Sequence, residues 1–283
     1  MSEFKNTATL LRFFILICYL TVGTYIIARQ RGESVEMIFR EFGDKAHPTI
    51  ILLHGGGLSW WAFADIIPLL KEKYHVVTPI IDGHGDDGKT TFISIEESAQ
   101  KLLQYIDTNF KGNVHALCGL SLGGQIIIDV LSRRVDIAKY AVIESAMVIP
   151  PGSLTRLLAK SSGMFYGLIR YKWFAKLQAK ALYINENLFN QYFDDSKKMS
   201  KESLVNISLS NVGYTVPDGL KYSKTNVMII IGGKEMKIMD KSARKLISIL
   251  PQAQLCKNPG MKHGELSLAR SKEYIALINR FIE

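Results

Sequence analysis

Residues 114–128 read VHALCGLSLGGQIII, an apolar run that passes through Gly119, Ser121 and Gly123 into a second apolar run. The first run is typical of a buried strand, and the second begins a helix at Leu122. A serine at the apex of so sharp a turn needs neighbours without a bulky Cβ two residues away on either side. The stretch therefore predicts a strand, a turn that exposes Ser121, and a helix whose first N–H groups favour negative charge.

Strand and helix patterns alternate along most of the remaining chain. Apolar runs typical of strands occur at 49–53, 75–80, 140–143 and 226–231, with a half-exposed edge strand expected at 34–40 and a short strand at 253–256. Helical spacing is found at 59–73, 94–110, 122–131, 241–250 and 266–282. This alternation predicts an α/β fold with a mostly parallel central sheet and helices on both faces.

The alternation stops between residues 146 and 219, where the pattern indicates several helices rich in aromatic and basic residues. We interpret this segment as a helical cap inserted over the C-terminal edge of the sheet. The length of 283 residues suits one globular domain, residues 32–283, that contains the insertion.

The N-terminal segment contains an uncharged run, FFILICYLTVGTYIIA, at residues 13–28. Leu10 and Leu11 extend the run beyond Arg12. A helix rises about 1.5 Å per residue, so residues 10–28 are just long enough to span a bilayer core of about 30 Å if Arg12 reaches the interface. We predict that residues 1–31 form an uncleaved single-pass N-terminal membrane anchor. A cleaved signal peptide and a buried helix are the alternatives, and basic residues on both flanks leave the orientation unpredicted.

The formal net charge is +9, and the sequence contains no Lys/Arg block of the kind that binds nucleic acid. The excess of positive charge favours binding to anionic surfaces such as lipid headgroups, although a solvated basic surface without a partner explains this charge equally well. Cys18, Cys118 and Cys256 lie in apolar runs or late strands and are interpreted as small buried hydrophobes. No Cys/His spacing resembles a metal site.

Acyl transfer by a serine also requires a base. His263 lies in the loop between the last expected strand and the C-terminal helix, from which a side chain can reach back over the sheet edge. His54 and His84 lie on other loops at that edge. Only His263 comes last in the chain order serine, acid, histidine, so it is the predicted base.

The predicted acid is Glu235, which follows the strand at 226–231 directly. Active-site residues of open α/β sheets gather beyond such strand ends. Glu144, at the end of the preceding strand, and Asp240 are the alternative acids. Glu235 could instead be a surface carboxylate paired with a neighbouring lysine.

The oxyanion needs backbone N–H donors. One is expected from Leu122, at the start of the helix after the serine. The other is expected from the three glycines that follow His54, most simply Gly56, with Gly57 as the alternate.

Five motifs occur in one order along the chain, and together they resemble the α/β-hydrolase fold superfamily: HGGG at 54–57, DGHG at 82–85, GLSLGG at 119–124, GGKE at 232–235 and GMKHG at 260–264. The resemblance extends from about Val35 to the C-terminus. It implies a Ser-His-acid enzyme with a helical cap that needs no metal or organic cofactor. Two departures are the glutamate at the acid position, where aspartate is commoner, and the missing proline in the loop at 82–85.

The leading hypothesis is a serine hydrolase that cleaves a carboxylic ester, or a thioester, through an acyl-Ser121 intermediate. The basic and aromatic cap segment and the predicted anchor favour small-molecule or lipid esters as substrates, with no role for nucleic acid. C–C bond hydrolysis or a lyase-type reaction on the same fold is one alternative. A non-catalytic binding protein that retains the fold is the other.

Overall fold

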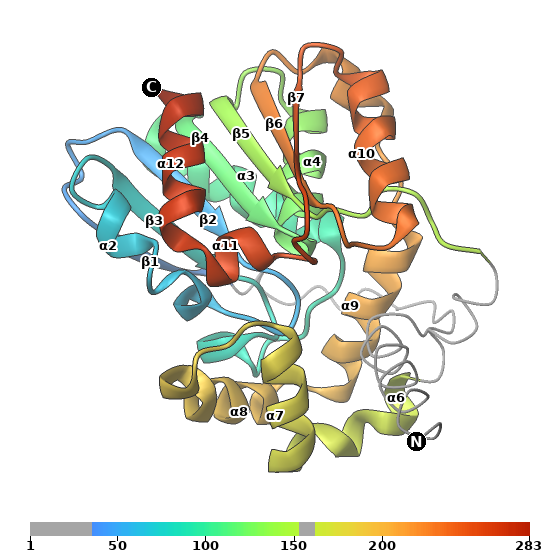
Figure 1. Ribbon diagram of the computed structural model, residues 1–283. Coiled ribbons are helices and arrows are strands. Elements are labelled where there is room, and N and C mark those ends of the chain that lie inside the picture. The colour runs from blue at the N-terminus through green and yellow to red at the C-terminus, as the bar shows by residue number, and fades with distance from the viewer. Residues whose placement is uncertain (1–35, 153–161) are drawn as a thin grey trace.

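The computed structural model describes residues 36–152 and 162–283, and these residues form a seven-stranded sheet (Figure 1). The strand order is β1-β3-β2-β4-β5-β6-β7, in which β1 is antiparallel to β3 and the other strands are parallel. The strands are β1 (Ile38–Phe42), β2 (Thr49–Leu53), β3 (His75–Ile80), β4 (Val114–Leu120), β5 (Ala138–Glu144), β6 (Asn226–Gly232) and β7 (Gln254–Asn258). The predicted α/β class with a mostly parallel sheet is confirmed.

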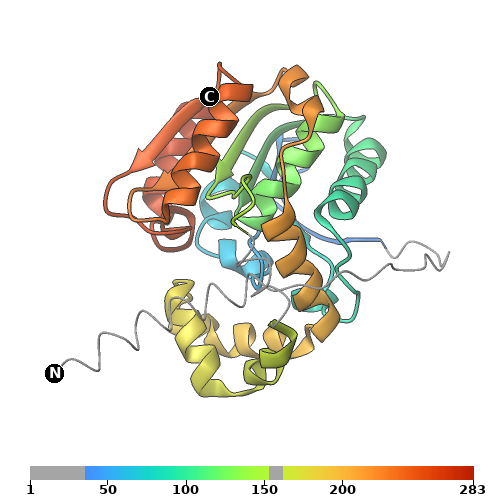
Figure 2. The same ribbon diagram turned by 90° about the vertical axis from the view of Figure 1, so that its right-hand side faces the viewer.

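Helices cover both faces of the sheet (Figures 1 and 2). One face carries α3 (Ile95–Phe110), α4 (Leu122–Arg133) and α10 (Lys237–Ile249), whose apolar sides share a core with the strands. The other face carries α2 (Ile67–Leu70), α11 (Glu265–Ala269) and α12 (Ser271–Ile282). Because both faces are covered, the central strands consist mostly of buried apolar residues.

Two predicted helices are each divided in the structure. The helical pattern at 59–73 forms the 3₁₀ helix η1 (Trp60–Phe63) and then α2, since Pro68 is tolerated only in the first turn of a helix. The C-terminal helix breaks at Arg270, whose backbone (φ −130°, ψ 48°) lies outside the helical region. Helix α3 is capped at its N-terminus, because Ser94 Oγ accepts a hydrogen bond from the Glu97 N–H at 3.1 Å.

The chain between β5 and β6 is largely helical in its described part and lies across the carboxyl ends of the strands (Figures 1 and 2). Its elements are α6 (Ser162–Phe165), η3 (Tyr166–Arg170), α7 (Lys172–Ala181), η4 (Glu186–Leu188), α8 (Phe189–Lys198), α9 (Lys201–Gly213) and η5 (Asp218–Tyr222). The short 3₁₀ helix η2 (Gly85–Asp87), which follows β3, contacts α8. An apolar cluster joins α7 and α8 to Leu58, Trp61 and Leu120 of the core. The helices therefore form a layer seated on the edge of the sheet where Ser121 lies.

The predicted membrane anchor, residues 1–31, lies outside the described residues. Within residues 36–152 and 162–283, no helix is both long and apolar enough to cross a bilayer. The anchor stays a prediction.

Candidate active site

Ser121 lies at the turn between β4 and α4 with a strained backbone. Its φ of 52° and ψ of −111° are rare for a residue with a side chain and cost on the order of 1–3 kcal/mol. A Cβ on Gly119 would come within 2.6 Å of the Gly123 backbone, and a Cβ on Gly123 within 2.4 Å of the Leu53 carbonyl oxygen. The two glycines thus let β4, α4 and the end of β2 approach closely enough to hold the turn, as the sequence predicted.

The glycine loop at 54–57 lies directly beside this turn. Strand β2 pairs with β4 so that Leu53 is opposite Gly119, which places the residues after Leu53 next to Ser121. The loop closes through a hydrogen bond from the Leu58 N–H to the Gly55 carbonyl at 3.2 Å. Gly57 has a φ of 74°, so a side chain there would be strained. Gly56 and Leu122, the predicted oxyanion donors, therefore lie on the two segments that flank Ser121.

His54 fixes the glycine loop to the rest of the sheet edge. Its Nε2 accepts a hydrogen bond from the Ile81 N–H at 3.1 Å, so its Nδ1 carries the proton and donates to the Gly55 carbonyl at 2.9 Å. Complete burial, followed by the nearby His84, lowers the pKa of His54 to about 3. A histidine that stays neutral and has both nitrogens bonded serves the loop's structure.

The structure brings Glu235 and His263 together. Glu235 Oε2 lies 2.8 Å from His263 Nδ1, and Glu235 Oε1 accepts from the Gly232 N–H at 2.6 Å. Burial acts to raise the pKa of Glu235, but these hydrogen bonds and the imidazole lower it overall. For His263, partial burial acts to lower the pKa, but the hydrogen bond to Glu235 and the charge of Glu235 hold this pKa above its ordinary value. The pair therefore favours an ionised carboxylate beside a basic imidazole.

Ser145 is a residue of the site that sequence reasoning missed. It follows β5 with a φ of 53°, and its hydroxyl donates to Glu235 Oε1 at 2.9 Å. The same hydroxyl accepts from the Gly264 N–H at 3.3 Å. One side chain thus braces the carboxylate and the loop that carries His263. The only signal in the sequence is its position directly after an apolar strand.

The two alternative acids have other partners. The buried Glu144 accepts from the Ser267 N–H at 3.3 Å, and Asp240 pairs with Arg244 and Lys257 at the surface. Among these carboxylates, Glu235 is the one hydrogen-bonded to His263.

The residues next to Ser121 and His263 in the chain, Leu120 and Gly264, lie close together. A Cβ on Gly264 would lie 3.0 Å from the side chain of Leu120, the residue before Ser121. Among the described contacts, the Ser121 hydroxyl makes no hydrogen bond to His263, whose side chain is 47% exposed. Such bonds are often long without substrate and tighten when it binds.

Glu235→Gln is expected to lower kcat by roughly 10³- to 10⁴-fold, because the amide neither fixes the tautomer of His263 nor stabilises its charged form. Loss of the carboxylate also lowers the pKa of His263. Since the base must be unprotonated, the acidic limb of the kcat/KM profile should move to lower pH in this variant. Steady-state ester hydrolysis across pH measures both effects. Asp240→Asn is the matched control, and an equal loss there would contradict the assignment of Glu235.

Glu144→Gln tests the second buried carboxyl. Burial raises the pKa of Glu144 to about 7. The unfolded chain ionises near its ordinary value of 4.5, so wild type loses stability as pH rises between the two values, whereas the variant has no proton to lose. The free energy of unfolding of the variant, measured in urea relative to that of wild type, should therefore increase by roughly 3 kcal/mol from pH 4.5 to 8. A difference that stays constant with pH would contradict a protonated Glu144.

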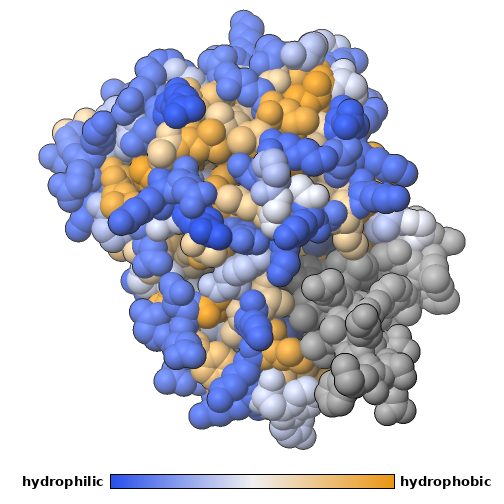
Figure 3. Space-filling view, in the orientation of Figure 1, coloured by the Kyte–Doolittle hydropathy of each residue, from blue (hydrophilic) through white to orange (hydrophobic). Residues whose placement is uncertain are grey.

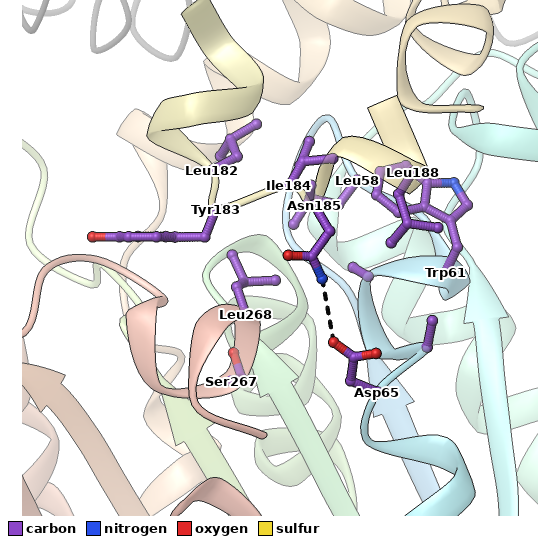
Figure 4. A pocket seen from close by; sticks show the side chains of 12 residues that line it. Leu58, Trp61, Asp65, Leu182, Tyr183, Ile184, Asn185, Leu188, Ser267 and Leu268 are labelled. Carbon is purple, nitrogen blue, oxygen red and sulfur yellow. Dashed lines mark hydrogen bonds between the residues drawn. The ribbon is translucent and has the colours of Figure 1, made fainter. Parts of the chain in front are cut away.

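A small pocket lies between the helical layer and the core next to the site (Figure 4). Its walls are mainly apolar and come from the segment after the glycine loop, the connection between α7 and α8, and α11. The apolar lining residues are Leu58, Trp61, Leu182, Ile184, Leu188 and Leu268. Asn185 closes one side by donating to Asp65 at 3.3 Å. Ser267 and Leu268 follow His263 closely in the chain, but Ser121, Glu235 and His263 themselves do not line this pocket. Within the described part of the chain, no group of three or more His, Cys, Asp or Glu side chains could hold a metal ion.

Comparison with known proteins identifies the family. A sequence model described as "Alpha/beta hydrolase family" matches residues 50–254, most of the chain. The chain belongs to the alpha/beta hydrolase family. The match includes Ser121 and Glu235, while His263 lies beyond its end. An uncharacterized hydrolase of Bacillus subtilis, YugF, is 21% identical over 243 residues, which cover 81% of this chain and 88% of that protein.

Solved structures show the same fold. An enol-lactonase from Burkholderia xenovorans LB400 superimposes with a TM-score of 0.73 at 16% identity, covering 87% of this chain and 96% of that one. A structure from work on the carboxylesterases of Nitrososphaera gargenis gives 0.71 at 17% identity, covering 90% and 97%. A pimeloyl-[acyl-carrier protein] methyl ester esterase of Neisseria meningitidis is 28% identical over 123 residues, 41% of this chain and 46% of that enzyme.

Proposed function

We propose that this protein is a serine hydrolase that cleaves carboxylic esters through an acyl-enzyme on Ser121. The observation that carries the proposal is the 2.8 Å contact between Glu235 and His263 Nδ1, at the sheet edge where the strained turn holds Ser121. A base whose far nitrogen makes no hydrogen bond among the described contacts and a partly exposed serine beside a helix N-terminus are the parts that acyl transfer needs.

In the proposed reaction, His263 Nε2 takes the proton of the Ser121 hydroxyl as its oxygen attacks the ester carbonyl. The N–H groups of Gly56 and Leu122 stabilise the oxyanion, and Glu235 stabilises the imidazolium. The imidazolium then protonates the leaving alcohol, which departs and leaves acyl-Ser121. Water, activated by His263, attacks this second ester and releases the carboxylic acid, which restores the serine.

The surroundings of Ser121 favour an apolar acyl or alcohol group. Leu58 and Leu120 flank the glycine loop and the serine, and both belong to the apolar cluster that includes α7 and α8. A hydrocarbon chain held there would displace water from the reacting carbonyl.

The proposal is tested by incubating the purified protein with esters of graded acyl length and identifying the products. Carboxylic acid and alcohol in equal amounts, with higher kcat/KM for apolar acyl groups, are expected. Cleavage of a carbon–carbon bond, or no turnover of any ester or thioester by folded protein, would contradict it.

We also propose that residues 13–28 anchor this enzyme in a membrane, with residues 32–283 as the hydrolase domain. The support is the uncharged apolar run, which together with Leu10 and Leu11 is just long enough to span a bilayer core if Arg12 reaches the interface. Retention of the full chain in vesicles after an alkaline carbonate wash is expected, and its release would overturn the anchor.

A further inference from the structure

The most exposed apolar side chain of the described residues lies on the helical layer, with two large aromatics close to it in the chain. Met164 is 79% exposed, Tyr171 57% and Trp173 60%. Figure 3 shows orange apolar residues interspersed with hydrophilic ones on this part of the molecule. Exposed apolar side chains that gather in one segment, unlike ones scattered singly, indicate a contact surface.

Helix α7 combines these aromatics with positive charge. Its buried side packs Phe174, Ala175 and Ala179 against the rest of the protein. Its solvent side is formed by Lys172, Trp173, Lys176 and Lys180. We call this solvent side, together with Met164, Arg170 and Tyr171, the cap face.

The charge of the cap face is nearly uncompensated. From Met164 to Ala181 the sequence has four basic residues and no acidic one. Lys172 lies 6.0 Å from the centre of the Phe193 ring and helps to lower the pKa of Asp194, whose closer partner is Lys197. Among the described ion pairs, none involves Lys176 or Lys180. A surface with free lysines and interfacial aromatics is complementary to anionic lipid headgroups.

The fold places the start of the described domain at the same edge of the sheet. Ile38, at the start of β1, pairs with Ile80, at the carboxyl end of β3, and Arg40 donates to Asp86 in the loop beyond that end. Seven residues, 29–35, separate the apolar run from Glu36. Fully extended, they span no more than roughly 30 Å. An anchor at residues 13–28 therefore holds the cap edge nearer the bilayer than the opposite edge.

We infer that the cap face docks on the anionic surface of the bilayer, with Tyr171 and Trp173 at headgroup level and the lysines toward lipid phosphates. The linker-length argument depends on the proposed anchor. The composition and charge of the cap face do not depend on it. Docking in this orientation presents the helical layer, and Ser121 beneath it, to molecules that partition into the membrane.

The test uses the full chain in vesicles of phosphatidylserine and phosphatidylcholine with brominated acyl chains, which quench nearby tryptophan. The chain holds three tryptophans, and Trp61 is buried. Wild type should lose up to about a third of its emission relative to unbrominated vesicles, and Trp173→Phe should lose far less. Lys176→Glu with Lys180→Glu should abolish the difference. The same two changes at Lys241 and Lys245, exposed on α10 away from the cap face, should preserve it (Figure 1).

Equal quenching in wild type and Trp173→Phe, in protein that survives the carbonate wash, would overturn docking while leaving the anchor. Release by the wash with Trp173-dependent quenching before it would overturn the anchor and support docking. Loss of quenching in both lysine pairs would also overturn docking, since it would show a general effect of charge. Ester hydrolysis in detergent, measured in parallel, reports on the proposed activity separately.

Discussion

Ser121→Ala and His263→Ala are each expected to lower kcat for ester hydrolysis by roughly 10⁴- to 10⁶-fold, and the double variant should be no slower than the worse single one. The reason is that the nucleophile and its base act as a unit, so removal of either ends acylation. Residual turnover would come from the oxyanion donors and substrate binding alone. Steady-state kinetics on one well-hydrolysed ester measures all three variants.

These losses should not come from unfolding. Ser121 makes no side-chain hydrogen bond among the described contacts, and His263 is half exposed, so Ser121→Ala should change the free energy of unfolding by less than about 1 kcal/mol. His47→Ala, at the opposite edge of the sheet, is the control for loss of a histidine and should retain full activity. Losses that multiply in the double variant would contradict a single catalytic unit.

Gly123→Ala is expected to cause the largest loss of stability, about 3 kcal/mol or more. The added methyl group would lie 2.4 Å from the Leu53 carbonyl oxygen and 2.8 Å from that of His54, and backbone atoms of a central strand cannot move aside cheaply. The glycine loop must therefore shift, and a shift of about 1 Å at the oxyanion donors would cost roughly 10²-fold in kcat. Urea unfolding and kinetics on the same sample measure both effects.

Gly213→Ala is the matched control. Nothing lies within 4 Å of a Cβ at Gly213, and its φ is not in the left-handed region. Alanine there should be neutral or stabilising by less than about 1 kcal/mol. Equal losses at both positions would show that the close approach at Gly123 is not what holds the turn.

The sheet was predicted most accurately where burial on both faces leaves only apolar residues. The strands at 49–53 and 75–80 have the predicted bounds, whereas the last strand is Gln254–Asn258 instead of 253–256. Half-exposed β7 mixes polar and apolar residues, so its pattern does not mark its ends. Helix α10 begins at Lys237, four residues earlier than predicted.

The site was predictable where one local turn sets the geometry and less so where distant segments meet. Gly119, Ser121 and Gly123 are close in sequence, so their spacing alone indicates the turn. The choice of Glu235 over Glu144 depends on which loop comes within hydrogen-bonding distance of His263. The order of these residues along the chain does not reveal that distance. The role of Ser145 depends on the same meeting of loops. The apolar pocket combines side chains from several separate segments, none of which signals it alone.

The most direct test of the acyl-serine mechanism is labelling with a fluorophosphonate probe, which reacts much faster with an activated serine than with an ordinary one, followed by intact mass and peptide mapping. We expect one adduct on wild type, located at Ser121, and none on Ser121→Ala or His263→Ala. Folded wild-type protein that takes up no probe, or an adduct that persists in Ser121→Ala, would contradict the mechanism.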